Sequence, residues 1–218
     1  MTPPRTLVVV LFGASLVACR DRNDQDAAQV AVPASSAPAA PATRAVLVAK
    51  RGTPILDGKL DQPVWHQAAR SAPFVDELGQ RPVPHTEARA SWDDSALYLE
   101  LYVADDELRA TDHVSIMLDG GLSVHASPAG TLTCTLQGVK DCATLGIRSG
   151  LDVDGDVDLD LKEDEEWSVT VALPWRTIAP QGRPGEVAMT LRRSDSAKGR
   201  PVREIWSRGS GVVRLAAE

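Results

Sequence analysis

Five aspartates at alternate positions are the clearest set of potential metal ligands in the chain: Asp152, Asp154, Asp156, Asp158 and Asp160. On a β-strand this spacing would place all five carboxylates on one face and the apolar residues between them toward the core. Oxygen ligands suit Ca²⁺, so one interpretation is a calcium site at Asp154, Asp156 and Asp158. The other is a solvated strand face whose charge discourages edge-to-edge aggregation. The second is favoured, because glycine is at the fourth position of the run and not at the sixth, as an EF-hand loop requires.

Residues for covalent or hydrolytic catalysis form no recognisable set. The four histidines, His66, His85, His113 and His125, are scattered among unrelated segments. The sequence contains no Gly-x-Ser-x-Gly, His-Glu-x-x-His or phosphate-loop motif. Carboxylates are numerous, yet nothing distinguishes one pair as the acid and base of a glycosidase. We therefore expect a protein that is not an enzyme and that needs no cofactor, apart from the Ca²⁺ considered above.

The charge of the chain argues against nucleic acid as a partner. Its formal net charge is −7, whereas contacts to a phosphate backbone need clustered Lys and Arg. A modest basic stretch does occur near the C-terminus, between Arg192 and Arg203. We interpret it as a solvated hairpin.

The cysteines indicate an exported protein. Residues 1–19 combine one early positive charge at Arg5 with a short apolar run, which is typical of a secretory signal and too short for a membrane span. The ending Leu-Val-Ala-Cys resembles a bacterial lipobox, so Cys19 is expected to be lipidated and to anchor the protein in the cell envelope. Arg20 after the cysteine favours the outer membrane. A secreted protein with an incidental Cys19 is the alternative.

Residues 20–45 are expected to form a tether. They are first charged and polar, then almost entirely Ala, Pro and Ser, without a periodic apolar face. Proline makes such a segment an extended spacer of about 3 Å per residue.

Two more cysteines, Cys134 and Cys142, flank a turn that contains glycine. In an exported chain this arrangement favours a local disulfide. Free thiols or a metal site are the alternatives, and the second lacks companion ligands.

Residues 46–218 form a single domain with the alternation of short β-strands. The strand-like segments 88–92 and 97–103 are joined by the turn residues Asp93, Asp94 and Ser95. Apolar residues alternate with polar ones in three further segments: Val114, Ile116 and Leu118; Trp167, Val169, Val171 and Leu173; and Val187, Met189 and Leu191. We expect an all-β fold, an antiparallel β-sandwich of jelly-roll type, with one or two short helices within 62–69 and 174–178.

Four segments in a fixed order resemble the β-sandwich of carbohydrate-binding module family 9. They are residues 55–65 (ILDGKLDQPVW), 91–99 (SWDDSALYL), 112–119 (DHVSIMLD) and 166–175 (EWSVTVALPW). The resemblance covers roughly Lys50 to Leu215. It implies a module that binds carbohydrate without catalysis.

The sugar clamp that the resemblance implies is not visible. Sugar-binding members use two exposed tryptophans, one before the strand at 112–119 and one in a loop before the last strand, and this chain has neither. Its five tryptophans match packing positions. If sugar binds, the matching residues are Arg109, His113 and Arg208, which offer hydrogen bonds without a stacking surface.

Two other interpretations stay open. One is a structural or interaction module of the envelope that has lost sugar binding; the sequence identifies no particular protein partner. The other is a haem-binding relative of the sandwich. Such a relative would use methionine as a haem ligand. The two methionines of this domain, Met117 and Met189, are at strand positions and are explained more simply as core residues.

Overall fold

The computed structural model describes residues 44–217 except 83–84, 159–164, 197–201 and 208–209. The predicted signal peptide with Cys19, and nearly all of the predicted tether, lie outside the described residues. In chain order the elements are β1 (Val46–Arg51), α1 (Pro63–Gln67), β2 (Thr86–Trp92), β3 (Ala96–Asp105), β4 (His113–Leu118), β5 (Ser123–Ala126), β6 (Leu132–Thr135), α2 (Cys142–Leu145), β7 (Arg148–Asp154), β8 (Glu165–Pro174), α3 (Trp175–Ile178), β9 (Glu186–Asp195), β10 (Val202–Ile205) and β11 (Gly211–Leu215). Within this part of the chain, no helix is long and apolar enough to cross a membrane.

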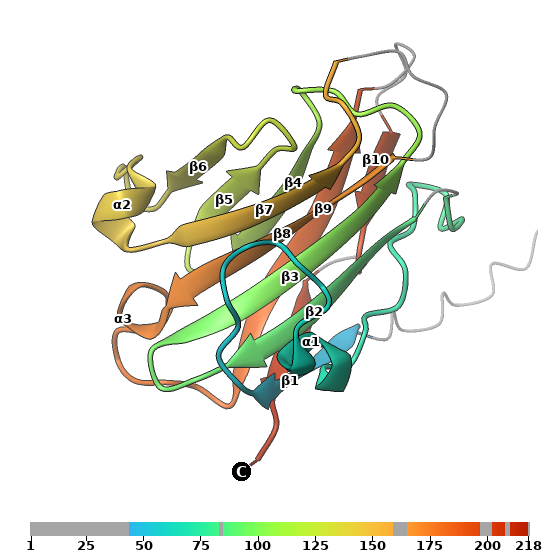
Figure 1. Ribbon diagram of the computed structural model, residues 1–218. Helices are drawn as coiled ribbons and strands as arrows, with labels where there is room; N and C mark the ends of the chain where they lie inside the picture. The colour runs from blue at the N-terminus through green and yellow to red at the C-terminus, as the bar shows by residue number, and fades with distance from the viewer. Residues whose placement is uncertain (1–43, 83–84, 159–164, 197–201, 208–209, 218) are drawn as a thin grey trace, which may run out of the picture. The chain divides into compact units, whose positions relative to one another are not determined.

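The strands form two layers that pack face to face. In the front layer of Figure 1 the order is β2-β3-β8-β7, and in the layer behind it β6-β5-β4-β9-β11. Strand β10 pairs with the half of β9 that β11 leaves unpaired, so β10 and β11 follow one another along the same edge of β9. The predicted β-sandwich is confirmed.

Strand β1 connects the two layers. Its first half pairs with β11, Val46 opposite Val212, and its second half pairs with β2, Lys50 opposite Ser91. Both pairings are parallel, whereas the sequence predicted antiparallel pairing throughout. The difference arises because the first strand enters between two layers instead of forming a hairpin with the next strand.

The core consists of the alternating residues that the sequence predicted to point inward. In β8 and β9, for example, Trp167, Val171, Met189 and Leu191 are all buried. The predicted hairpin is also present, since β2 and β3 pair from Thr86 opposite Val103 to the turn at Asp93. Period two in the sequence thus corresponds to one-sided burial in β9, whereas β2 and most of β3 are buried on both sides.

The described residues form three short helices, of which the sequence predicted two. Helix α1 begins at Pro63, whose fixed φ suits the first helical position, and α3 follows β8 directly. Helix α2 was not predicted. Its first turn is capped by Asp141, whose carboxylate accepts hydrogen bonds from two backbone N–H groups, and it ends at Gly146 with φ 68°.

A disulfide joins Cys134 at the end of β6 to Cys142 at the start of α2. The predicted pairing is confirmed. Cys134 is buried in the main core, so the bond fixes α2 to the edge of its layer.

Candidate functional site

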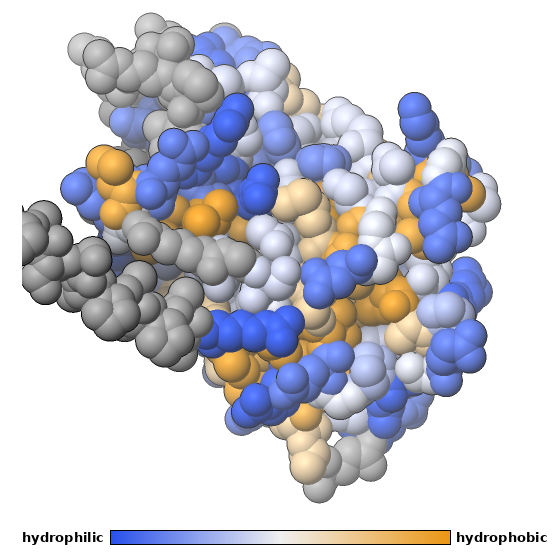
Figure 2. Space-filling view, turned by 180° about the vertical axis from the view of Figure 1, so that it is seen from behind, coloured by the Kyte–Doolittle hydropathy of each residue, from blue (hydrophilic) through white to orange (hydrophobic). Residues whose placement is uncertain are grey.

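A pocket of about 520 Å³ opens on the outer face of β4, β5, β9 and β10. This layer is behind in Figure 1 and faces the viewer in Figure 2, where hydrophilic and apolar residues are interspersed over an uneven surface. The lining residues are Glu77, His113, Ser115, Met117, His125, Arg192, Arg193, Ser194, Arg203 and Ile205. They come from four strands and one loop, so the sheet itself forms the floor.

The strand registers decide which side chains are neighbours on this floor. Ser115 of β4 is opposite His125 of β5 on one side and Arg192 of β9 on the other. Ile205 of β10 is in turn opposite Arg192. These residues form one row across the sheet, because directly paired positions in antiparallel strands have Cβ atoms about 5 Å apart.

A second row lies two residues further along the strands. His113 is opposite Ser194, and Ser194 is opposite Arg203. The two rows together bring His113, Arg192 and Arg203 to adjacent positions of one surface.

The imidazole of His125 is held by two serines. Its Nδ1 lies 2.8 Å from the Ser115 hydroxyl and its Nε2 lies 2.8 Å from the Ser123 hydroxyl. Its ring centroid is 5.6 Å from that of His113. Burial, and secondarily the neighbouring His113, lower the pKa of His125, so this ring is neutral near pH 7.

His113 offers hydrogen-bonding capacity to the pocket. Its Nδ1 lies 3.1 Å from the carbonyl oxygen of Thr111, and the described residues place no partner on its Nε2. His113 is therefore oriented by the backbone, with one ring nitrogen available to a ligand.

Among the described residues, no tryptophan side chain lines the pocket. All five tryptophans are buried, with exposures of 1% for Trp65, 2% for Trp92, 1% for Trp167, 6% for Trp175 and 4% for Trp206. Their predicted packing role is confirmed. The apolar part of the floor comes from Met117 and Ile205 instead.

The predicted ligand-binding residues have different positions. His113 lines the pocket, whereas Arg109 does not and instead forms an ion pair with Glu107. Arg208 lies outside the described residues. His125, Arg192 and Arg203 were not predicted as site residues. The two arginines belong to the basic stretch interpreted as a solvated hairpin. They are on the outer face of β9 and β10, and both line the pocket.

The acidic run does not continue as a strand. Strand β7 ends at Asp154, Gly155 has φ 125° and Asp158 has φ 66°, so the expected single face of carboxylates is wrong beyond Asp154. The Asp158 carboxylate accepts a hydrogen bond from the Ala110 N–H. Asp156 is exposed and Asp160 lies outside the described residues. Calcium binding at Asp154, Asp156 and Asp158 stays a prediction, and these three are not among the metal-ligand groups that converge in the described chain.

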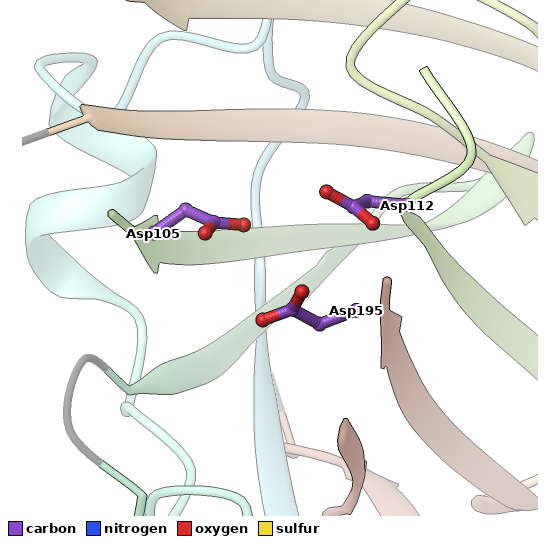
Figure 3. A group of neighbouring side chains, drawn as sticks. All are labelled: Asp105, Asp112 and Asp195. Atoms are coloured by element: carbon purple, nitrogen blue, oxygen red, sulfur yellow. The ribbon is translucent and has the colours of Figure 1, made fainter. Parts of the chain in front are cut away.

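One carboxylate group does converge. Asp105, Asp112 and Asp195 have oxygens within 4.8 Å of one another, at the ends of β3, β4 and β9 (Figure 3). The guanidinium of Arg193 contacts two of the three carboxylates, at 2.8 Å from Asp105 and 2.9 Å from Asp195. Asp112 instead accepts hydrogen bonds from the Arg109 N–H and from the N–H and hydroxyl of Ser196. Burial raises the pKa of Asp105 to about 7, while Arg193 acts in the opposite direction. Asp105 and Asp195 thus form a buried ion-pair network with Arg193 that joins strand ends.

Comparison with known proteins identifies the fold. No protein-family model matches the sequence, and no curated protein sequence matches it significantly. A family 9 carbohydrate-binding module from Caldicellulosiruptor kristjanssonii, solved with cellotriose, matches with a TM-score of 0.58 at 16% identity, over 79% of this chain and 94% of the module. A family 9 module from that organism solved with glucose gives 0.57 at 16% identity, over 79% and 96%.

A third structure, a candidate carbohydrate-binding protein from Bacteroides uniformis, matches with a TM-score of 0.53 at 12% identity, over 80% of this chain and 100% of that protein. The domain therefore has the family 9-like β-sandwich that the sequence resemblance predicted.

Proposed function

We propose that this domain binds carbohydrate, without converting it, in the pocket on β4, β5, β9 and β10. The observation that carries the proposal is the convergence of His113, Arg192, Arg203 and Ser194 on one hollow of a sheet, beside the apolar Met117 and Ile205. Sugar sites combine hydrogen-bonding groups with an apolar surface for the ring in this way. The similar family 9 modules solved with glucose and cellotriose support the proposal.

The contacts of His125 favour binding over hydrolysis. Ser115 and Ser123 both contact its ring, so a serine–histidine pair exists. A serine nucleophile also needs a third group that orients the base. In the described part of the chain neither His113 nor His125 contacts a carboxylate, and their bonds are to serine hydroxyls and a backbone carbonyl.

The burial of the tryptophans lowers the affinity for sugar that we expect. A pyranose on Met117 and Ile205 gains less than one clamped between two indole rings, because aromatic pairs add stabilisation beyond the area they bury. We therefore expect modest affinity for neutral sugars, carried mainly by hydrogen bonds. The alternative function, an envelope interaction module without sugar binding, is favoured by the same absence of an exposed tryptophan.

Glycan binding by the full chain, purified in mild detergent, tests the proposal. We expect binding to at least one class of oligosaccharide, weakened at least tenfold by His113→Ala. The exposed Ile55→Ala substitution, on a distant loop, is the control and should leave binding unchanged. Absence of binding to every soluble glycan and cell-wall polymer at millimolar concentration would support the interaction module instead.

For its location, we propose that the chain is an envelope lipoprotein anchored through Cys19, with residues 20–45 as the tether. Several acyl chains, at about 0.8 kcal/mol per buried CH₂, would hold it firmly at the membrane. Cys19→Ser should move the protein from the detergent-extracted fraction to the soluble fraction. If the variant still needs detergent, another element attaches it.

A further inference from the structure

The pocket is basic although the protein is acidic. The chain has a formal net charge of −7, yet Arg192 and Arg203 both line the hollow, and Glu77 is the one acidic residue among the described residues around it. Arg193 also borders the pocket, but its side chain is buried and bound to Asp105, Asp195 and Glu204. The positive charge of the site therefore comes from Arg192 and Arg203, and Glu77 is the opposing charge among its described lining residues.

The sheet brings these two arginines to one place. Arg203 of β10 is opposite Ser194, and Arg192 is two residues before Ser194 on β9. Arg192 and Arg203 are thus diagonal neighbours on the outer face, about 7–8 Å apart at their backbones and within joint reach of one small group. His113 of β4 is opposite Ser194 on the other edge of β9, so it is the third side chain beside this position.

Neither guanidinium forms an ion pair with a carboxylate of the described chain. Other surface arginines of the domain do: Arg214 contacts Glu186 at 2.7 Å and Arg183 contacts Asp94 at 3.1 Å. No such ion pair to a described carboxylate is formed by Arg192 or Arg203. Two adjacent cations repel one another, and an anion placed between them offsets this repulsion, whereas a neutral hydroxyl does not.

We infer that the ligand of this pocket is an acidic sugar, a pyranose whose carboxylate is bound by Arg192 and Arg203. The planar guanidinium fork matches a carboxylate with two parallel hydrogen bonds. The ring of the same sugar then lies toward Met117 and Ile205, with His113 Nε2 at its hydroxyls. The inference rests on the proposed function and specifies its ligand class as uronic acids.

Calorimetric titration of the full chain with matched trisaccharides tests the inference. The probes are trigalacturonate, its neutral trimethyl ester and cellotriose. We expect trigalacturonate to bind at least tenfold more tightly than its ester, and the difference to shrink in high salt because exposed charges are screened. Arg192→Gln and Arg203→Gln should each weaken trigalacturonate about 10- to 100-fold and weaken the ester by a clearly smaller factor, so that the preference for the acidic sugar is lost. Arg214→Gln removes an equivalent exposed charge outside the pocket and should change nothing.

The outcomes separate this inference from the proposed function. Equal or tighter binding of the ester or cellotriose would overturn the acidic ligand and leave carbohydrate binding intact. No binding of any of the three would overturn the acidic ligand, and together with a negative result in the wider glycan survey it would overturn the proposed function as well. Equal binding of inorganic sulfate alone, or tighter binding of a sulfated trisaccharide, would overturn the assignment to a sugar carboxylate. Thermal unfolding of each variant shows whether its fold is retained.

Discussion

The rings of His113 and His125 lie 5.6 Å apart between centroids and at 67° to one another, edge toward face. The two residues belong to β4 and β5, and the register that pairs Ser115 with His125 makes them diagonal neighbours on the outer face. His125 is fixed by serines on both sides. The two rings therefore form one fixed side of the pocket, and His113 is the ring that is available to a ligand.

Trp65→Ala is expected to destabilise the domain by about 3–5 kcal/mol. Trp65 is 1% exposed and packs with Tyr98, Ala96 and Ala172 in a second apolar cluster, on the outer face of the front layer. A helix as short as α1 is held only by such packing. Urea unfolding measures the change, with Ile55→Ala as control, since Ile55 is 69% exposed. An unchanged unfolding midpoint for Trp65→Ala would contradict the packing role.

Loss of the disulfide should cost about 2–3 kcal/mol, because the loop between Cys134 and Cys142 is short and its closure removes little entropy from the unfolded chain. The native protein should resist alkylation until it is reduced. Mass spectrometry after alkylation, with and without reductant, measures this. Immediate labelling of both thiols without reductant would refute the bond.

The wild-type domain should lose stability as the pH rises from 4.5 to about 8, and Glu100→Gln should abolish this loss. Burial raises the pKa of Glu100 from 4.5 to about 8, and its carboxylate accepts a hydrogen bond from the Thr170 hydroxyl. A raised pKa means that the folded state binds the proton more tightly than the unfolded state. The contribution is therefore complete below pH 4.5 and falls by about 1.4 kcal/mol per pH unit as the pH rises toward about 8.

The Gln variant keeps the size of Glu100 but cannot ionise. Its free energy of unfolding should match that of the wild type near pH 5 and exceed it at pH 8.5. Urea titrations across this range give the comparison. Parallel curves for the two proteins would show that Glu100 does not titrate with folding.

Arg193→Met should be more damaging than any exposed arginine substitution. It leaves Asp105, Asp195 and Glu204 without their shared cation in a buried site, which costs about 3–5 kcal/mol. The loss should be smaller at pH 5 than at pH 8, because burial already raises the pKa of Asp105 and Glu204 and protonation removes their charge.

Arg214→Met is the matched control for this experiment. Arg214 and Glu186 are about half exposed, and such a pair contributes at most about 1 kcal/mol. Equal destabilisation by the two substitutions would contradict the role of Arg193 as the centre of the network.

The sequence predicted the strands and the core well, because one local rule governs both. Alternation such as Val187, Met189 and Leu191 depends only on neighbours along the strand, and burial follows it. The same rule failed for the acidic run, where Gly155 and Asp158 adopt positive φ and end the strand geometry. Glycine and aspartate tolerate that conformation better than most residues, so the break had a signal in the residue types.

The pocket could be predicted only in part, because it depends on register between strands. His113 was identified from a motif position, but His125 and Arg203 reach it through pairings of β4 with β5 and of β9 with β10. Those pairings join segments distant in the sequence. The alternation of Val187, Met189 and Leu191, continued by two residues, puts Arg193 on the core side of β9 and Arg192 on the outer side. It does not say which strands lie beside Arg192.

Strand β1 also determines how the domain carries a mechanical load. Tension applied at residue 44 enters β1, which pairs with β11 and β2. Two further bonds flank the strand: the Val212 N–H donates to the carbonyl of Ala45 just before it, and the Gly52 N–H just after it donates to the carbonyl of Trp92. Because such a pull is directed along β1, it loads the bonds between the strands in shear, all together, and does not open them one by one. From β11 the load passes to β9, the strand that carries Arg192, so force applied at residue 44 reaches the floor of the pocket through continuous sheet.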